Sequence, residues 1–121
     1  MRIVFCEDQA ILRKLIALSL RGTAHEFRMA EHGAEALELV RAWRPDVLFT
    51  DIAMPGVDGL ELAARLRADP ELRDLPIVFM TASTHLETIE EAGAGGPPWL
   101  HLRKPFGPAA LQALIASLER G

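Results

Sequence analysis

The feature that most constrains the fold is a series of five short segments that are apolar throughout or alternate polar with apolar residues. Segments of this length, rich in Val, Ile, Leu and Phe, are typical of β-strands and too short for most helices. The stretches between them carry apolar residues at helical spacing instead. The predicted strands are Arg2–Cys6, His25–Ala30, Asp46–Thr50, Pro76–Thr81 and Trp99–Leu102.

A helix is expected after each strand, which makes strand and helix alternate along the whole chain. Such alternation indicates βαβ units, and hence an α/β protein whose mostly parallel sheet is covered by helices on both faces. Asp8 could cap the first helix and Gly22 could stop it. The predicted helices are Gln9–Arg21, Gly33–Trp43, Leu60–Arg67, a short one from Ser83 or Thr84 to Gly93, and one beginning near Pro108.

The composition excludes several classes of protein. A chain of 121 residues is long enough for one hydrophobic core, so we expect a single domain over residues 1–121. The net charge is −4 and the basic residues are scattered, which argues against direct binding of nucleic acid or an anionic membrane. Cys6 is the only cysteine, so neither an internal disulfide nor a cysteine zinc site is possible. Without a membrane-span or signal-peptide pattern, we expect a cytoplasmic protein.

Polar side chains follow four of the five predicted strands: Glu7 and Asp8, then Asp51, Thr81 and Lys104. Because the carboxyl ends of parallel strands lie at one edge of a sheet, these side chains should meet there. Three crowded carboxylates repel one another and favour a bound cation, for which Mg²⁺ is the natural candidate. A lysine would pair with the carboxylates or with an incoming phosphoryl group, and a threonine hydroxyl could donate to that group as well.

Each of these residues also has an ordinary structural explanation. Asp8 could be a helix cap, Thr81 a strand-end cap and Lys104 part of a surface ion pair. The glycine-rich stretch Ala92–Pro98 does not form a phosphate-binding loop, because such a loop follows a strand and opens a helix, whereas this one does the reverse. The convergence of all the polar strand ends on one edge favours a functional site.

The chain resembles the receiver domain of two-component response regulators, the CheY-like domains. Four motifs carry the resemblance, and their order and spacing match over essentially the whole chain. They are Glu7-Asp8, Asp51-Ile52-Ala53-Met54-Pro55-Gly56-Val57-Asp58-Gly59, Thr81-Ala82 and Lys104-Pro105-Phe106. The resemblance implies a flavodoxin-like, doubly wound, five-stranded parallel sheet of order 2-1-3-4-5 with five helices.

The resemblance also implies a site centred on Asp51 as the phosphoacceptor. The carboxylates of Asp8 and Asp51 and the backbone carbonyl of Ala53 would coordinate Mg²⁺, and Glu7 would act through a water. The phosphoryl group would come from the phosphohistidine of a sensor histidine kinase or of a phosphotransfer protein. The domain would promote only its own phosphorylation and dephosphorylation, and would not be an enzyme in the usual sense.

Further roles follow from the same resemblance. Thr81 and Lys104 would hold the phosphoryl oxygens, and the Lys104–Pro105 peptide bond would be cis. The switch in this family pairs the threonine with an aromatic residue of the fifth strand, and here that position is His101. Phosphorylation would change the surface of the fourth helix, fifth strand and fifth helix, which a downstream protein or output domain would read. A phosphorylation-dependent dimer is a further possibility.

Two other functions are compatible with the fold. A receiver fold could act as a constitutive protein-interaction module, although the complete set of site residues argues against this. A haloacid-dehalogenase-type hydrolase also uses an aspartyl nucleophile after a strand. That chemistry needs a second Asp two residues later as the general acid and base, and Ala53 occupies this position.

Overall fold

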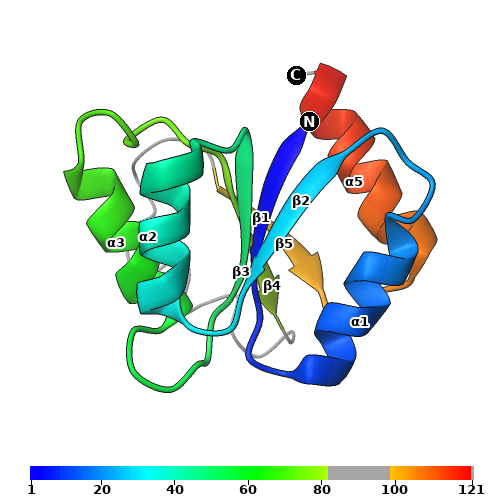
Figure 1. Ribbon diagram of the computed structural model, residues 1–121, viewed down its shortest axis with the longest axis horizontal. Helices are drawn as coiled ribbons and strands as arrows, with labels where there is room; N and C mark the ends of the chain where they lie inside the picture. The colour runs from blue at the N-terminus through cyan, green and yellow to red at the C-terminus, as the bar shows by residue number, and fades with distance from the viewer. Residues whose placement is uncertain (82–98, 121) are drawn as a thin grey trace.

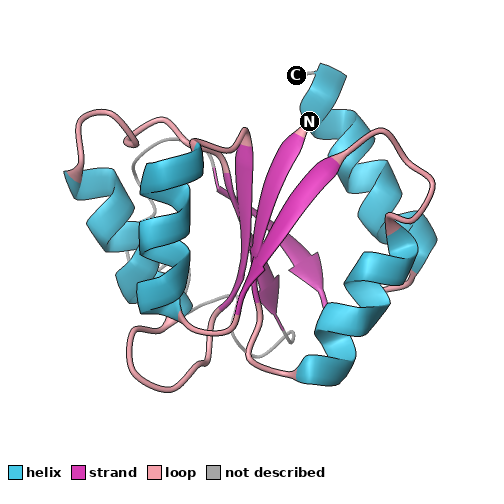
Figure 2. Cartoon of the chain, viewed as in Figure 1, coloured by secondary structure: helices cyan, strands magenta, loops and turns pink. Residues whose placement is uncertain are grey.

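The computed structural model of the protein describes residues 1–81 and 99–120. These residues form a five-stranded sheet in which all neighbouring strands run parallel (Figure 2). The order is β2-β1-β3-β4-β5, which confirms the expected topology, and each strand bound lies within one residue of its expected position. The strands are β1 (Arg2–Cys6), β2 (Glu26–Ala30), β3 (Val47–Asp51), β4 (Ile77–Thr81) and β5 (Trp99–Arg103).

The described part of the chain contains four helices, which cover both faces of the sheet. In Figure 1, α1 and α5 lie on one face, and α2 and α3 lie on the other. The short helix expected from Ser83 or Thr84 to Gly93 falls outside the described residues. None of the described helices is long and apolar enough to cross a membrane. The helices are α1 (Ala10–Ser19), α2 (Gly33–Trp43), α3 (Gly59–Ala68) and α5 (Pro108–Arg120).

Successive side chains of each strand point to opposite faces of the sheet, and this divides the core in two. In β1, Ile3 and Phe5 join the hydrophobic cluster under α1 and α5, whereas Val4 and Cys6 join the cluster under α2 and α3. Nearly all residues of β1, β3 and β4 are buried, as expected for central strands covered on both sides. The sheet therefore holds the ends of its strands in fixed positions.

The first helix begins and ends differently from the expectation. Asp8 is not its N-cap: Gln9 occupies that position in an extended conformation, and no side-chain hydrogen bond caps the helix. The helix ends at Ser19, two residues before the expected Arg21. The backbone of Leu20 leaves the helical conformation (φ −102°, ψ 1°), and the N–H of Arg21 bonds to the carbonyl of Leu18, three residues back instead of four. The carboxylate of Asp8 therefore does not cap α1 and is available to the site described below.

Two glycines bring α2 and α3 close to the loop that leaves β3. A Cβ atom added at Gly59, the first residue of α3, would lie 2.0 Å from the backbone oxygen of Asp51. One added at Gly33, the first residue of α2, would lie 2.3 Å from the backbone oxygen of Val57. Real Cβ atoms never approach oxygen this closely, so any side chain at either position would displace the loop. The missing side chains let the two helices hold the segment that follows Asp51.

Candidate functional site

Of the two acidic residues after β1, one lies in the interior and the other on the surface. The carboxylate of Glu7 is fully buried, whereas Asp8 is exposed. The backbone N–H of Glu7 donates to the carbonyl of Ala30 at 3.0 Å, which extends the pairing of β1 with β2 by one residue. Two chemically similar neighbours thus have opposite environments, and only Glu7 needs a partner inside the protein.

Lys104 supplies that partner and joins two strand ends. Its Nζ lies 2.8 Å from Oε1 of Glu7 and 3.0 Å from Oδ2 of Asp51, the last residue of β3. Burial opposes the charge on the ammonium, but the hydrogen bonds to the two carboxylates outweigh this effect and raise the pKa of Lys104. The lysine is therefore protonated at neutral pH and connects two buried carboxylates.

Three carboxylates converge at this edge of the sheet. One oxygen from each of Glu7, Asp8 and Asp51 can be chosen so that all three lie within 4.8 Å of one another. Desolvation and the neighbouring Glu7 raise the pKa of Asp8 above its ordinary value. A single ammonium offsets only one of the three negative charges. The donor set of hard oxygens and its excess negative charge fit a divalent cation such as Mg²⁺.

Thr81 lies at the same edge. It is the last residue of β4, and its side chain is buried. Its carbonyl oxygen accepts a hydrogen bond of 2.8 Å from the backbone N–H of Lys104, so the ends of β4 and β5 are tied together. The Lys104–Pro105 peptide bond is cis, as the resemblance implies. The four expected strand ends therefore lie at one edge of the sheet, and the role of the Thr81 hydroxyl stays a prediction.

Within residues 1–81 and 99–120, no side-chain hydrogen bond or ion pair joins the predicted site residues Ala53 and His101 to this cluster. Ala53 lies exposed in the loop after β3, and the role of its carbonyl in binding Mg²⁺ stays a prediction. His101 is exposed on β5, where its register partner on β4 is Phe79, two residues before Thr81. A pairing between His101 and the threonine hydroxyl also stays a prediction.

Arg13 belongs to the site region, and sequence reasoning did not select it. Its Nη1 donates to the backbone carbonyl of Glu7 at 2.9 Å, and its Nη2 lies 2.8 Å from Oε1 of Glu31. The only signal in the sequence is a basic residue one turn into the helix that follows the acidic pair. Such a residue looks like an ordinary solvent-facing helix position.

Cys6 lies directly before the acidic pair, but it is an ordinary core residue. Its side chain is completely buried, and its thiol donates to Sδ of Met54 at 3.5 Å. Burial raises the pKa of Cys6 to about 12, so the thiol stays protonated and unreactive near neutral pH. This agrees with the interpretation of Cys6 as a small apolar strand residue.

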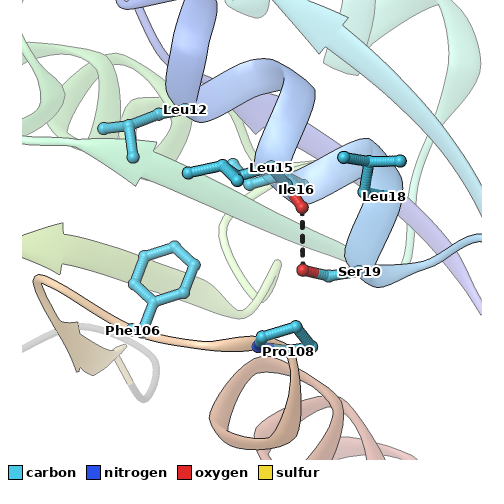
Figure 3. A pocket seen from close by; sticks show the side chains of 7 residues that line it. All are labelled: Leu12, Leu15, Ile16, Leu18, Ser19, Phe106 and Pro108. Atoms are coloured by element: carbon cyan, nitrogen blue, oxygen red, sulfur yellow. Dashed lines mark hydrogen bonds between the residues drawn. The ribbon is translucent and has the colours of Figure 1, made fainter.

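An apolar groove lies between α1 and the segment that leads into α5 (Figure 3). Its volume is about 250 Å³. Along α1, the side chains of Ile11, Leu15 and Leu18 are more than half exposed. The groove is lined by Leu12, Leu15, Ile16, Leu18, Ser19, Phe106 and Pro108.

The doubly wound parallel sheet, with lysine-bridged carboxylates at its carboxyl edge, defines a flavodoxin-like class of α/β domain. Comparison with known proteins gives the family: residues 3–116 match the model of the response regulator receiver domain. The chain belongs to this family of two-component signalling proteins.

Individual relatives agree with this family. Over 121 residues the chain is 37% identical to the response regulator MprA of Mycobacterium leprae, with 99% of this chain and 51% of the relative covered. The chain thus spans about half the length of the curated relatives it matches.

Solved structures agree as well. The chemotaxis protein CheY4 of Vibrio cholerae superposes with a TM-score of 0.86 at 27% identity, and 97% of both chains is covered. The receiver domain of the sensor histidine kinase PA1611 from Pseudomonas aeruginosa superposes with a TM-score of 0.85 at 25% identity, covering 99% of this chain and 98% of the other. That structure holds a magnesium ion in its active-site cleft.

Proposed function

We propose that the protein, as a single receiver domain over residues 1–121, accepts a phosphoryl group on Asp51 from the phosphohistidine of a sensor histidine kinase or a phosphotransfer protein. The observation that carries the proposal is the geometry of the acidic edge. Three carboxylate oxygens lie within 4.8 Å of one another, and Lys104 bridges Glu7 and Asp51. A nucleophile, a cation site and a mobile positive charge are the elements that phosphoryl transfer to a carboxylate requires.

The carboxylates of Asp8 and Asp51 and the carbonyl of Ala53 would hold Mg²⁺, with Glu7 acting through a water. When bound, the ion neutralises negative charge that would otherwise repel a phosphoryl group. The magnesium-containing receiver domain supports this assignment because a protein of the same fold holds the ion in its active-site cleft.

The transfer itself uses groups of this chain. An oxygen of Asp51 attacks the phosphorus atom, the new P–O bond forms as the P–N bond to the donor histidine breaks, and the bonding electron pair stays on the ring nitrogen. Lys104 already contacts Oδ2 of Asp51, so a small movement brings its ammonium to a phosphoryl oxygen. The hydroxyl of Thr81 would donate to another. Positioning and charge neutralisation supply most of the catalysis in such a loose transition state.

The phosphoryl group would then act as a switch. It adds charge at the end of β3, and Lys104 and Thr81 respond together because their backbones are hydrogen-bonded. The change would pass to β5, including His101, and to α5. A downstream protein or output domain would read the altered surface, either as the monomer or as a phosphorylation-dependent dimer. The twofold greater length of the curated relatives supports an output domain as one such partner.

Intact mass spectrometry tests the chemistry. The parent, Asp51→Asn and the exposed control Asp74→Asn are incubated with acetyl phosphate, with and without Mg²⁺. We expect a phosphate adduct on the parent and on the control that needs Mg²⁺ and is missing from Asp51→Asn. If the parent gains no adduct and also fails to bind beryllofluoride, the phosphoacceptor function is wrong, and a constitutive interaction module becomes the better explanation.

A further inference from the structure

We propose that Arg13 is a positioning residue that sets the acidic pair in the geometry needed to bind a divalent cation. The inference rests on the proposed function, because it concerns the same cation site. Arg13 lies on α1, and its side chain is only 19% exposed. Its guanidinium holds the backbone carbonyl of Glu7 with one nitrogen and the carboxylate of Glu31 with another. It contacts none of the three cation-binding carboxylates in these hydrogen bonds, so it would act through the backbone.

The contact with Glu7 fixes a peptide group that two site residues share. The carbonyl of Glu7 and the N–H of Asp8 belong to one planar peptide unit, so holding the carbonyl orients the backbone on which Asp8 is carried. The backbone N–H of Glu7 is held by Ala30, and its carboxylate oxygens by Gln9 and Lys104. Arg13 holds the remaining polar group of Glu7, its backbone carbonyl, so the acidic pair is restrained from both sides of the turn.

The second contact keeps the guanidinium in place. Glu31 follows β2, and its own backbone N–H donates to Oε1 of Glu35 on α2. The fork of Arg13 therefore joins the turn after β1 to the turn after β2, two segments at the same edge of the sheet. An arginine suits this position because its planar fork can reach two acceptors at fixed geometry, which a lysine cannot.

The cation site needs such a restraint because its ligands repel one another. Asp8 is exposed, so packing does not hold its side chain near the carboxylates of Glu7 and Asp51. If the peptide unit between Glu7 and Asp8 were free to rotate, Asp8 would relax away from its neighbours and the cation would lose a preformed site. Groups that orient metal ligands without touching the metal typically change affinity by ~10- to 100-fold.

Calorimetric titration with Mg²⁺ of the full chain tests the inference, alongside thermal melting in EDTA. The variants are Arg13→Ala, Arg13→Lys and the control Arg21→Ala, which removes an exposed arginine beyond the end of α1. We expect Arg13→Ala to raise the Kd for Mg²⁺ by about tenfold. Arg13→Lys should recover part of the affinity because its ammonium still reaches one acceptor. Arg21→Ala should bind as the parent does.

The outcomes separate this inference from the proposed function. An Arg13→Ala variant whose Kd for Mg²⁺ stays within about twofold of the parent value overturns the positioning role, even if its Tm in EDTA falls. If Arg13→Ala does not melt cooperatively, Mg²⁺ binding is measured with Glu31→Ala instead. The positioning role then requires that Glu31→Ala weakens Mg²⁺ binding several-fold. A parent that binds no Mg²⁺ overturns both proposals. A parent that binds Mg²⁺ but takes no phosphate overturns the proposed function alone.

Discussion

The two faces of the sheet bury apolar side chains against helices, whereas its carboxyl edge buries charge. On the faces, β1, β3 and β4 contribute almost continuous apolar surface, and burial of that surface stabilises the fold. At the edge, Glu7, Asp51 and Lys104 leave water and recover only part of the lost hydration through one another. Apolar burial on the faces therefore stabilises the fold. Burial of charge at the edge lowers that stability but keeps a reactive carboxylate in place.

The largest expected loss of stability comes from a face, and it should leave the chemistry intact. Leu62 of α3 is fully buried in the cluster under α2 and α3. Leu62→Ala should lower the free energy of unfolding by roughly 2–5 kcal/mol, because it removes buried methyl groups and leaves a cavity. Urea denaturation measures the loss. The Mg²⁺-dependent phosphate adduct on the folded fraction should persist, and its disappearance at low temperature would show that face and edge are not separable.

A substitution at the edge should lower both the stability of the fold and the formation of the phosphate adduct. Lys104→Met keeps the length of the side chain but leaves the buried carboxylate of Glu7 without its cation. We expect a loss of about 2–3 kcal/mol, below the full cost of breaking a buried pair because Lys104 is partly exposed. Added Mg²⁺ should recover part of the loss by supplying positive charge.

The exposed lysine Lys14 provides the matched control for this edge variant. Lys14→Met should change the free energy of unfolding by no more than about 0.5 kcal/mol. Equal effects of the two substitutions in urea denaturation would mean that the Glu7–Lys104 pair contributes nothing to stability. The phosphate adduct should form slowly or not at all in Lys104→Met and normally in Lys14→Met.

The faces were also easier to predict from the sequence than the edge. Apolar segments and helical spacing predicted β1 and α2 with the bounds that the structure shows. The strand order was implied by the family resemblance, since alternation alone indicates a parallel sheet but no order. The end of α1 was placed too late because the apolar Leu20 continues the helical spacing although its backbone has already left the helical conformation.

At the edge, the sequence predicted which residues would meet but not their environments. Glu7 and Asp8 are adjacent acids, and nothing in their identity says that one would be buried against Lys104 while the other stays exposed. That division depends on where β1 stops and how the chain turns into α1. Arg13 was missed for a similar reason, because its partner is a backbone carbonyl and backbone groups carry no sequence signal.

Acidification should act on the edge and leave the faces unchanged. The pKa of Asp8 is raised above its ordinary value of 3.8, so the folded state binds this proton more readily than the unfolded state. Without Mg²⁺, the contribution of Asp8 to stability therefore increases as the pH falls through the raised pKa. With Mg²⁺ the sign reverses, because the ion binds only the carboxylate.

Melting curves with and without Mg²⁺ from about pH 7 down to about pH 3, a range that passes below the ordinary pKa of an Asp carboxyl, measure this effect. The rise in Tm that Mg²⁺ produces should shrink as the pH falls. Asp8→Asn should show a smaller rise at every pH and a weaker pH dependence. A rise in Tm that is constant across the range would contradict a role for Asp8 in binding the ion.

The smallest change in the free energy of unfolding is expected for an exposed apolar side chain, Ile11, which belongs to neither region. Ile11 and Ile16 both lie on α1, but Ile11 is 70% exposed and Ile16 is 1% exposed. Ile16→Ala should lower the free energy of unfolding by roughly 2–5 kcal/mol, while Ile11→Ala should change it by no more than about 0.5 kcal/mol. The two substitutions are chemically identical, so helix propensity cancels between them and urea denaturation isolates burial. A large loss for Ile11→Ala would mean that this side chain is covered in solution.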